Sequence, residues 1–251
     1  MVCFPRTWWC ERPLIFAHRG ASAVAPENTL AAFRRALEMG ADGVELDVHL
    51  SADGVPVVMH DARVEATTDG TGSLVDLSLK ELKSLDAGSW FAEDFAGEQI
   101  PTLEEVLADV GNSLLINIEL KPAFSKRKGL EAAVADVVQR VGVSERVWFS
   151  SFVPYSLYRM RNLLPGVPCG FLYGGSSLFS WLFKSFTPFE AVHPEARLVT
   201  PALVRRAHKR GLRVITWTVD DADQARLFAR WGVDGLITNN PAQLLRVLGE
   251  G

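Results

Sequence analysis

The chain has 251 residues, of which 48% are hydrophobic and 22% charged, and its formal net charge is −4 at pH 7. This composition is typical of a globular protein, and the length fits one (β/α)₈ barrel, with residues 1–251 as a single domain. The acidic balance provides no basic surface for nucleic acid, so we expect no nucleic-acid partner.

The cysteines and the N-terminus favour a reducing compartment. Cys3, Cys10 and Cys169 do not make an even disulfide framework. Residues 1–13 lack the continuous apolar stretch of a signal peptide. No uncharged apolar run reaches the ~18 residues that a membrane-spanning helix needs. We therefore expect a cytoplasmic protein without a transmembrane segment.

The first predicted elements are a strand and an amphipathic helix. The apolar stretch Leu14–His18 predicts a strand, which ends in a His-Arg-Gly turn. The Pro-Glu-Asn sequence at 26–28 then predicts a helix start, with Asn28 as the N-cap. The buried stripe of this helix should consist of Leu30, Phe33 and Leu37, and a glycine at position 40 should end it.

The second predicted strand carries two carboxylates on one face. Because side chains alternate along a strand, Glu45 and Asp47 point one way while Val44, Leu46 and Val48 point the other. Two carboxylates on one face are costly to bury unless a positive charge lies between them. A divalent cation meets this need, and oxygen ligands alone favour Mg²⁺ or Ca²⁺. The alternative is a pair of rim acids in ion pairs.

A third apolar run follows a polar turn at 51–54 and ends in His60-Asp61. Two histidines, His18 and His60, therefore leave strand ends close in sequence to the two carboxylates. By strand alternation, His49 would point to the same face as these carboxylates, but it follows the expected end of its strand. We expect His49 at the rim or in solvent.

From 62 to 100 the alternation of strands and helices is interrupted. The segment is rich in turn residues and is longer than an ordinary connection in a barrel. We expect a small insertion after the second barrel strand that extends over the barrel mouth. Trp90 and Phe91 should anchor this insertion or shape the pocket.

The next predicted strand, from Leu114 to Lys121, repeats the polar pattern. Asn117, Glu119 and Lys121 share one face, opposite to the apolar side chains of the strand. Glu119 can supply a third carboxylate to the metal, and Lys121 a fixed positive charge beside it. Taken alone, this pair indicates a cross-face salt bridge, but after the preceding motifs it indicates a site.

The remaining chain alternates predicted helices and strands and completes eight barrel strands. We expect helices at 103–111, 130–141, 154–164, 200–209, 221–231 and 242–248, and strands at 146–151, 167–173, 190–193, 213–219 and 235–238. Ser151 either contacts phosphate or caps a helix. His193, at a strand end, is a weaker candidate for the mouth, and His208 should lie at the surface.

Residues 174–190 are unusually aromatic. The segment contains Phe179, Trp181, Phe183, Phe186 and Phe189 with a single lysine. Aromatic residues at helical spacing favour a barrel helix that packs on its sheet. The alternatives are a dimer contact, or a lip that makes weak contact with lipid or with an apolar alcohol group.

As a set, these motifs resemble the glycerophosphodiester phosphodiesterase family of the cytosolic bacterial type, over nearly the whole chain. In chain order they are HRG at 18–20, PENT at 26–29, ELD at 45–47, DG at 53–54, HD at 60–61, PTLEEVL at 101–107, ELK at 119–121 and TW at 216–217. The resemblance implies a (β/α)₈ barrel that uses one divalent cation. Its substrates would be glycerophosphodiesters, which it would hydrolyse to glycerol 3-phosphate and an alcohol.

The resemblance also implies roles for further residues. In the family, Glu27 and Asn28 lie near the catalytic mouth, and an aromatic side chain at the position of Trp217 contacts the glycerol part of the substrate. The family often has an acid where this chain has Asn239. We place that difference at the rim, where it leaves the central assignment intact.

For the chemistry, we expect His18 and His60 to act as an acid–base pair, because the leaving oxygen needs a proton and the attacking oxygen must lose one. Arg19, Lys121 and the cation would bind the charge on the phosphate. The metal ligands would be Glu45, Asp47 and Glu119. Either the glycerol 2-hydroxyl attacks first and water opens the cyclic phosphate, or water attacks directly.

Rival functions follow from the same motifs. One is a lysophospholipase D-like enzyme or a lyase that stops at the cyclic phosphate, although secreted relatives of this type carry disulfides that this chain lacks. Another is a non-catalytic barrel that binds phosphodiesters, which predicts the loss of at least one catalytic position, and none is lost. The sequence leaves open the alcohol group, Mg²⁺ or Ca²⁺, and a monomer or a homodimer.

Overall fold

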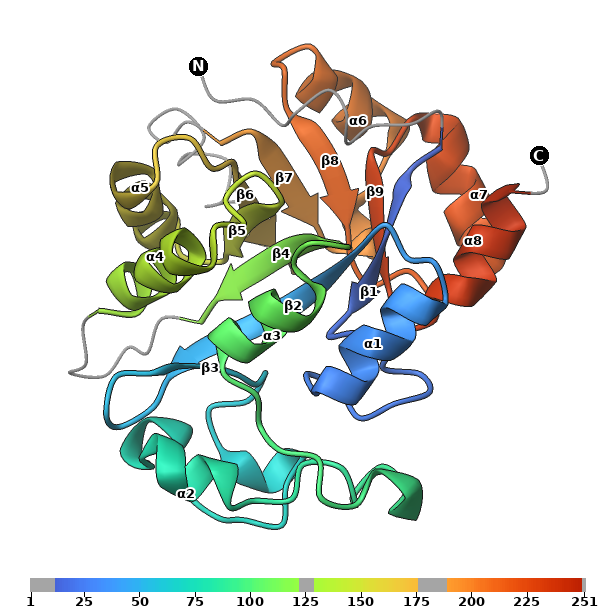
Figure 1. Ribbon diagram of the computed structural model, residues 1–251. Coiled ribbons are helices and arrows are strands. Elements are labelled where there is room, and N and C mark those ends of the chain that lie inside the picture. The colour runs from blue at the N-terminus through green and yellow to red at the C-terminus, as the bar shows by residue number, and fades with distance from the viewer. Residues whose placement is uncertain (1–11, 122–128, 176–188, 250–251) are drawn as a thin grey trace.

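A closed parallel barrel forms the centre of the computed structural model, which describes residues 12–121, 129–175 and 189–249 (Figure 1). The barrel closes because β1 pairs in parallel with both β2 and β9. Its strands are β1 (Leu14–His18), β2 (Gly43–Leu50), β4 (Leu115–Leu120), β5 (Val147–Ser151), β6 (Cys169–Tyr173), β7 (Ala191–Pro194), β8 (Arg213–Thr216) and β9 (Gly235–Thr238). The predicted (β/α)₈ barrel is confirmed.

Helices cover the outside of the barrel (Figure 1). They are α1 (Leu30–Glu38), α3 (Leu103–Val110), α4 (Leu130–Val141), α5 (Pro154–Leu163), α6 (Pro201–His208), α7 (Ala222–Trp231) and α8 (Pro241–Gly249). Short polar side chains begin several of them, since Thr29, Thr102, Thr200 and Asp221 each accept a hydrogen bond from a first-turn backbone N–H. Within the described ranges, no helix has the length and hydropathy to cross a bilayer.

Some predictions lie outside the described residues. The aromatic segment at 174–190 falls largely on residues 176–188, which the structure does not describe. The same holds for Cys3 and Cys10, whereas Cys169 is buried in β6 with a free thiol.

Two details of α1 differ from the prediction. The N-cap is Thr29 and not Asn28, because Asn28 has a positive φ of 59° and donates a hydrogen bond to Asp47. Leu37 is 39% exposed, and the buried stripe consists of Ala32, Phe33 and Ala36. The side chain of Asn28 is thus directed to the barrel mouth, and the helix begins one residue later.

Side-chain alternation produces two apolar layers. The outward side chains of the strands, such as Val44, Leu46 and Val48 in β2, pack in the cluster beneath the helices. The inward layer consists of Leu14, Phe16, Leu115, Trp148, Ala191, Ile215 and Ile237. Phe16 and Trp148 meet edge to face, with ring centroids 4.8 Å apart. Leu14, Leu115, Trp148 and Ala191 are the first or second residues of their strands, so apolar side chains fill the amino end of the barrel and polar residues such as Glu119 follow toward the other end.

The insertion follows β3 (Pro56–Val58), which pairs antiparallel with β2. It contains the short helix α2 (Leu79–Lys83) and lies beside β3 and α3 (Figure 1, teal). A small core of its own holds it together: Val57, Met59, Val64, Leu74, Leu82, Ala87 and Ile100. Trp90 contacts Phe91 edge to face, and neither lines the pocket described below. Thr67 and Ala87 share a small cleft with Glu27 and His60, so the insertion borders the mouth.

Candidate active site

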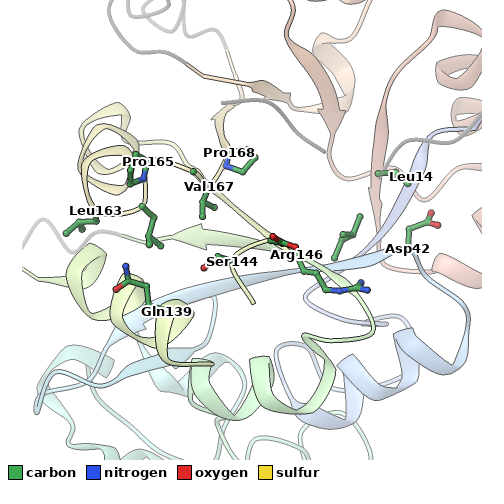
Figure 2. Close-up of a pocket in the computed structure, with 13 residues that line it drawn as sticks. Leu14, Asp42, Gln139, Ser144, Arg146, Leu163, Pro165, Val167 and Pro168 are labelled. Atoms are coloured by element: carbon green, nitrogen blue, oxygen red, sulfur yellow. The ribbon is translucent and has the colours of Figure 1, made fainter. Parts of the chain in front are cut away.

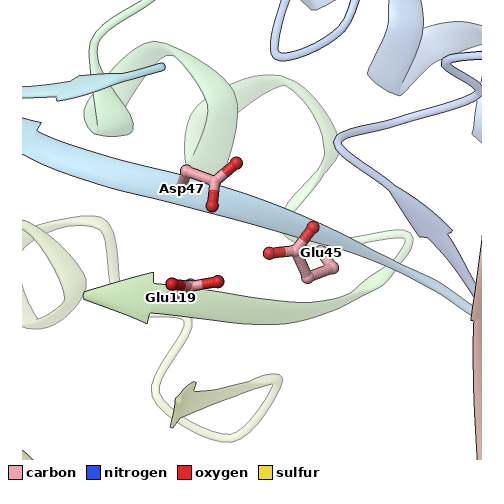
Figure 3. Close-up of side chains that lie close together, drawn as sticks. All are labelled: Glu45, Asp47 and Glu119. Carbon is pink, nitrogen blue, oxygen red and sulfur yellow. The ribbon is translucent and has the colours of Figure 1, made fainter. Parts of the chain in front are cut away.

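Three carboxylates from neighbouring strands converge at the carboxyl ends of β2 and β4 (Figure 3). Glu45 and Asp47 come from β2 and Glu119 from β4, and the register places Asp47 beside Glu119. One oxygen of each lies within 4.8 Å of the other two, and none of the three residues is more than 7% exposed. The strand parity seen in the sequence therefore brings these groups together.

Two cations partly compensate this negative charge. Lys121 Nζ lies 3.0 Å from Asp47 Oδ1 and 2.7 Å from Glu119 Oε1, and Arg19 Nε lies 3.4 Å from Asp47 Oδ2. Burial alone would raise the pKa of Asp47, but Lys121 and Arg19 outweigh it and lower that pKa to about 2. Burial, followed by repulsion from Asp47, raises the pKa of Glu119 to about 7.

The electrostatics of the cluster fit a divalent cation. Burial, with repulsion from Asp47 and Glu119, raises the pKa of Glu45 well above its usual range. The two side-chain cations do not balance the three carboxylates, and Arg19 also pairs with Glu27 at 2.8 Å, so negative charge is left uncompensated. Buried charge of one sign is costly, and three carboxylates are a donor set that Mg²⁺ and Ca²⁺ prefer.

The backbone around Asp47 adopts uncommon conformations. Arg19 and Asn28 have φ values of 56° and 59°, in the left-handed region that residues with a side chain rarely adopt. Asn28 Nδ2 donates to Asp47 Oδ2 at 3.0 Å, and Arg19 Nη1 donates to Glu27 Oε1 at 2.8 Å. Such conformations persist where the surroundings fix them, typically at functional sites. Glu27 and Asn28 are thus connected to the site by their hydrogen bonds to Arg19 and Asp47.

His18 has a defined tautomer. Asn239 Nδ2 donates to Asp220 Oδ2 at 2.6 Å, so the amide oxygen of Asn239 faces His18 Nδ1 at 2.7 Å. Because that oxygen only accepts, we assign the proton of His18 to Nδ1. Burial, followed by the positive charge of Arg19, lowers the pKa of His18 to about 4. Asn239 is therefore a direct partner of His18, which corrects its placement as a rim difference.

Two hydrogen bonds hold His60, one to its side chain and one to its backbone. Its Nδ1 donates to Asp61 Oδ1 at 2.8 Å, and its carbonyl oxygen accepts from His49 Nε2 at 3.0 Å. The expectation that His49 lies at the rim or in solvent is wrong. His49 belongs to β2 and is 6% exposed, because pairing with β3 extends that strand to residue 50. His49 thereby ties β2 to the turn that carries His60.

One pocket of about 140 Å³ joins these groups. Its lining consists of polar residues, His18, Arg19, Glu45, His60, Asn117, Glu119 and Lys121, and of apolar residues, Phe152, Leu172, Trp217 and Ile237. Trp217 donates to the carbonyl oxygen of His193 and contacts Phe152 edge to face, with centroids 5.6 Å apart. The sequence motifs predict Trp217 as a pocket residue, but no motif indicates Phe152.

Three residues that the sequence offered as weaker candidates for the site do not line the pocket. Ser151 Oγ donates to the carbonyl oxygen of Leu120 and accepts from the N–H of Val153, so it neither lines the pocket nor serves as the N-cap of α5. His193 is fully buried and does not line the pocket. His208 lies at the surface as predicted and pairs with Asp234.

A larger cavity, of about 930 Å³, lies at the opposite end of the barrel (Figure 2). Leu14, Asp42, Arg146 and Pro168, which line it, stand at or just before the amino ends of their strands. Chemistry in (β/α)₈ enzymes takes place at the carboxyl ends of the strands. The smaller pocket, with its convergent polar groups, is therefore the candidate active site.

The fold and this pocket define a class of protein, a (β/α)₈ barrel whose mouth combines buried carboxylates with two histidines. Residues 18–243 match the "Glycerophosphoryl diester phosphodiesterase family", and the chain belongs to this family. The predicted family and the predicted enzyme class are thereby confirmed.

Relatives of known name and structure agree with this assignment. A "Glycerophosphodiester phosphodiesterase" of Caldanaerobacter subterraneus is 41% identical over 241 residues, which cover 96% of this chain and 99% of the relative. The human "Glycerophosphodiester phosphodiesterase 1" is 32% identical, with 85% of this chain and 74% of the relative covered. A solved Oleispira antarctica phosphodiesterase in complex with the product sn-glycerol-3-phosphate has a TM-score of 0.85 and 31% identity, covering 95% of this chain and 97% of that one.

Proposed function

We propose that this protein hydrolyses glycerophosphodiesters to sn-glycerol 3-phosphate and an alcohol, with one divalent cation, Mg²⁺ or Ca²⁺. The observation that carries the proposal is the convergence of three buried carboxylates beside a pocket that two of them, Glu45 and Glu119, line together with His18 and His60. The relatives named above support the substrate class, and the Oleispira protein was solved with this product. The cytoplasmic location, the single-domain organisation and the oligomeric state stay predictions of the sequence analysis.

The proposed metal ligands are Glu45, Asp47 and Glu119. When bound, the cation stabilises negative charge on the phosphate oxygens. Glu45, Asp47, Glu119 and Glu27 with Arg19 and Lys121 sum to a formal charge of −2, which a divalent cation would neutralise. A phosphodiester monoanion could then approach Arg19 and Lys121 even though the chain as a whole carries −4. Arg19 and Lys121 bind the phosphate oxygens in this proposal.

The two histidines do the proton transfers. Asn239 holds the Nδ1 proton of His18, which leaves the Nε2 lone pair to accept a proton from the attacking hydroxyl or water. Asp61 holds Nδ1 of His60, so its Nε2 is the atom that donates a proton to the leaving oxygen. The partner of His18 is a neutral amide and that of His60 is a carboxylate, and this difference supports His18 as the first base and His60 as the first acid.

The remaining predicted substrate-binding residues act in two ways. Trp217, together with Phe152, forms an apolar wall against which the carbon chain of glycerol packs. Glu27 and Asn28 hydrogen-bond to Arg19 and Asp47, and we propose that they position these two residues rather than contact the substrate.

Product analysis with glycerophosphocholine tests this proposal. With Mg²⁺ or Ca²⁺ present, we expect sn-glycerol 3-phosphate and choline in equal amounts. Accumulation of a cyclic glycerol phosphate would instead identify a lyase that stops at that stage. Release of choline from lysophosphatidylcholine alone would identify the lysophospholipase D-like alternative. No product from any of these diesters, with a folded protein, would overturn the proposal.

A further inference from the structure

Asn117 is a buried polar residue that the proposed chemistry does not use. Its side chain is completely buried in the barrel, yet it lines the candidate active site. Neither Oδ1 nor Nδ2 has a hydrogen-bond partner among the described residues. Leaving such a group unpaired destabilises the fold, and a buried polar group in a native protein is normally satisfied. A side chain in this state at the wall of a pocket points to a ligand.

The position of Asn117 is the floor of the pocket. It precedes Glu119 by two residues on the same inward face of β4, and it pairs in register with Glu45 of β2. The strand runs toward the mouth, so Asn117 lies one step deeper than Glu119. Its register partner on the other side is Trp148, which belongs to the apolar layer that closes the barrel. A ligand group that reaches Asn117 therefore has no further space below it.

The chemistry of the floor favours a hydroxyl group. The amide of Asn117 offers a donor and an acceptor at the same point, which a hydroxyl matches because it also does both. An anion at this depth would face the carboxylates of Glu45 and Glu119 and would be repelled. The phosphate has better partners in Arg19 and Lys121, near the mouth.

The size and the walls of the pocket favour a small polyol. About 140 Å³ is small beside the roughly 300–1,000 Å³ of pockets that hold drug-sized ligands. Leu172, Trp217 and Ile237 provide apolar wall for a short carbon chain. We propose that Asn117 binds a hydroxyl of the glycerol part of the substrate and so makes the pocket select glycerol over an alkyl group. This inference rests on the proposed function, because that function places glycerol in this pocket.

Binding measurements on the Mg²⁺- or Ca²⁺-loaded protein test the role of Asn117 without a catalytic step. The two ligands are sn-glycerol 3-phosphate and propyl phosphate, which share the phosphate and the carbon chain but differ in the hydroxyls. We expect the wild-type protein to bind glycerol 3-phosphate roughly 10- to 100-fold more tightly, as measured by calorimetry. In Asn117→Leu, which keeps the branched shape with larger methyl groups and no hydrogen bonds, only glycerol 3-phosphate should lose a specific contact, and the ratio should fall to about threefold or less.

Ser150→Ala is a matched control. Ser150 is also fully buried on an inward face, and its hydroxyl has no hydrogen-bond partner among the described residues, but it does not line the pocket. This control should keep the wild-type ratio between the two ligands. Thermal unfolding of Asn117→Leu should occur at or above the wild-type temperature, because the variant removes an unpaired buried amide. If it unfolds earlier, Asn117→Ala provides the same comparison with a smaller side chain.

Two results would overturn the role of Asn117. They are an unchanged ratio in both variants of Asn117, or an equal loss of affinity for both ligands. Failure of the proposed function gives a different result, because the wild-type protein would then release no glycerol 3-phosphate from glycerophosphocholine.

Discussion

Two clusters of buried charged residues in this protein differ in whether their positive and negative charges cancel. At the mouth, three carboxylates share the two cations Arg19 and Lys121. Beside α5 and β7, Arg161 donates to both carboxylate oxygens of Glu190, and the N–H of Cys169 donates to the same carboxylate at 2.8 Å. The second group is balanced and lines none of the pockets described above. Imbalance of buried charge, rather than burial itself, therefore distinguishes the candidate site.

The two groups should respond differently to mutation. Removing one partner of a balanced buried pair leaves an unpaired buried charge, and this lowers the stability of the fold. The fold holds an unbalanced cluster in place, and the excess charge of such a cluster can bind a ligand of opposite sign. Changes at the mouth should therefore alter turnover, and changes at Arg161 and Glu190 should alter stability.

The largest effect is expected from His18→Ala and His60→Ala. Each change removes a proton-transfer group, so kcat for release of glycerol 3-phosphate should fall by about 10²–10⁴-fold. The unfolding temperature should stay close to that of the wild type, because both side chains lie in the pocket rather than in the apolar layers. Turnover near the wild-type value in both variants would sink the assignment of the acid–base pair.

Arg161→Met should have the opposite profile. The change leaves Glu190 buried without its cation, so the free energy of unfolding in urea should fall by about 3–5 kcal/mol. The value of kcat/KM should stay within about twofold, since Arg161 lines no part of the active-site pocket. Arg34→Met is the control, because Arg34 pairs with Asp109 at the surface and its loss should cost about 1 kcal/mol or less. Intact stability with lost turnover would refute the comparison.

The smallest effect concerns His193, a buried base for which the described residues provide no charged partner. Burial lowers its pKa to about 3, whereas an unfolded histidine titrates near 6.5. Between these values the unfolded state binds more protons, so stability falls as the pH decreases from about 6.5 toward 3. At pH 5 the loss attributable to His193 should be roughly 2 kcal/mol relative to pH 7.

Urea unfolding of wild type and His193→Gln at pH 7 and pH 5 measures this contribution. The variant should lose less stability between the two pH values by about that amount. His208→Gln changes an exposed histidine and should leave the contribution of His193 in place. Equal pH dependence in wild type and His193→Gln would show that His193 is not a neutral buried residue.

Strand alternation, taken together with the neighbouring motifs, predicts the centre of the site. The parity of Glu45, Asp47 and Glu119, and their order along the chain, require them to meet once adjacent parallel strands form. The eight barrel strands followed from the same periodicity. Contacts of this kind depend on local pattern and neighbouring strands, which a sequence displays directly.

Contacts across the closure of the barrel were not predictable in the same way. Asn239 reaches His18 because β9 pairs with β1, and these two residues are 221 positions apart in the chain. Asn28 looked like a helix cap because its sequence context suits one, but its side chain is turned to Asp47 instead. His49 was misplaced because the antiparallel pairing with β3 lengthens β2.

The central claim is that the carboxylate cluster holds a cation needed for turnover. Its most direct test is glycerol 3-phosphate release from glycerophosphocholine by chelator-treated protein, before and after Mg²⁺ or Ca²⁺ is restored. We predict negligible release without a cation, recovery with one, and stabilisation of about 2.7 kcal/mol at a cation concentration of 100 Kd. Glu119→Gln should lose both effects, whereas Arg161→Met should keep them. Full turnover in the chelated protein, or undiminished stabilisation of Glu119→Gln by the cation, would contradict the claim.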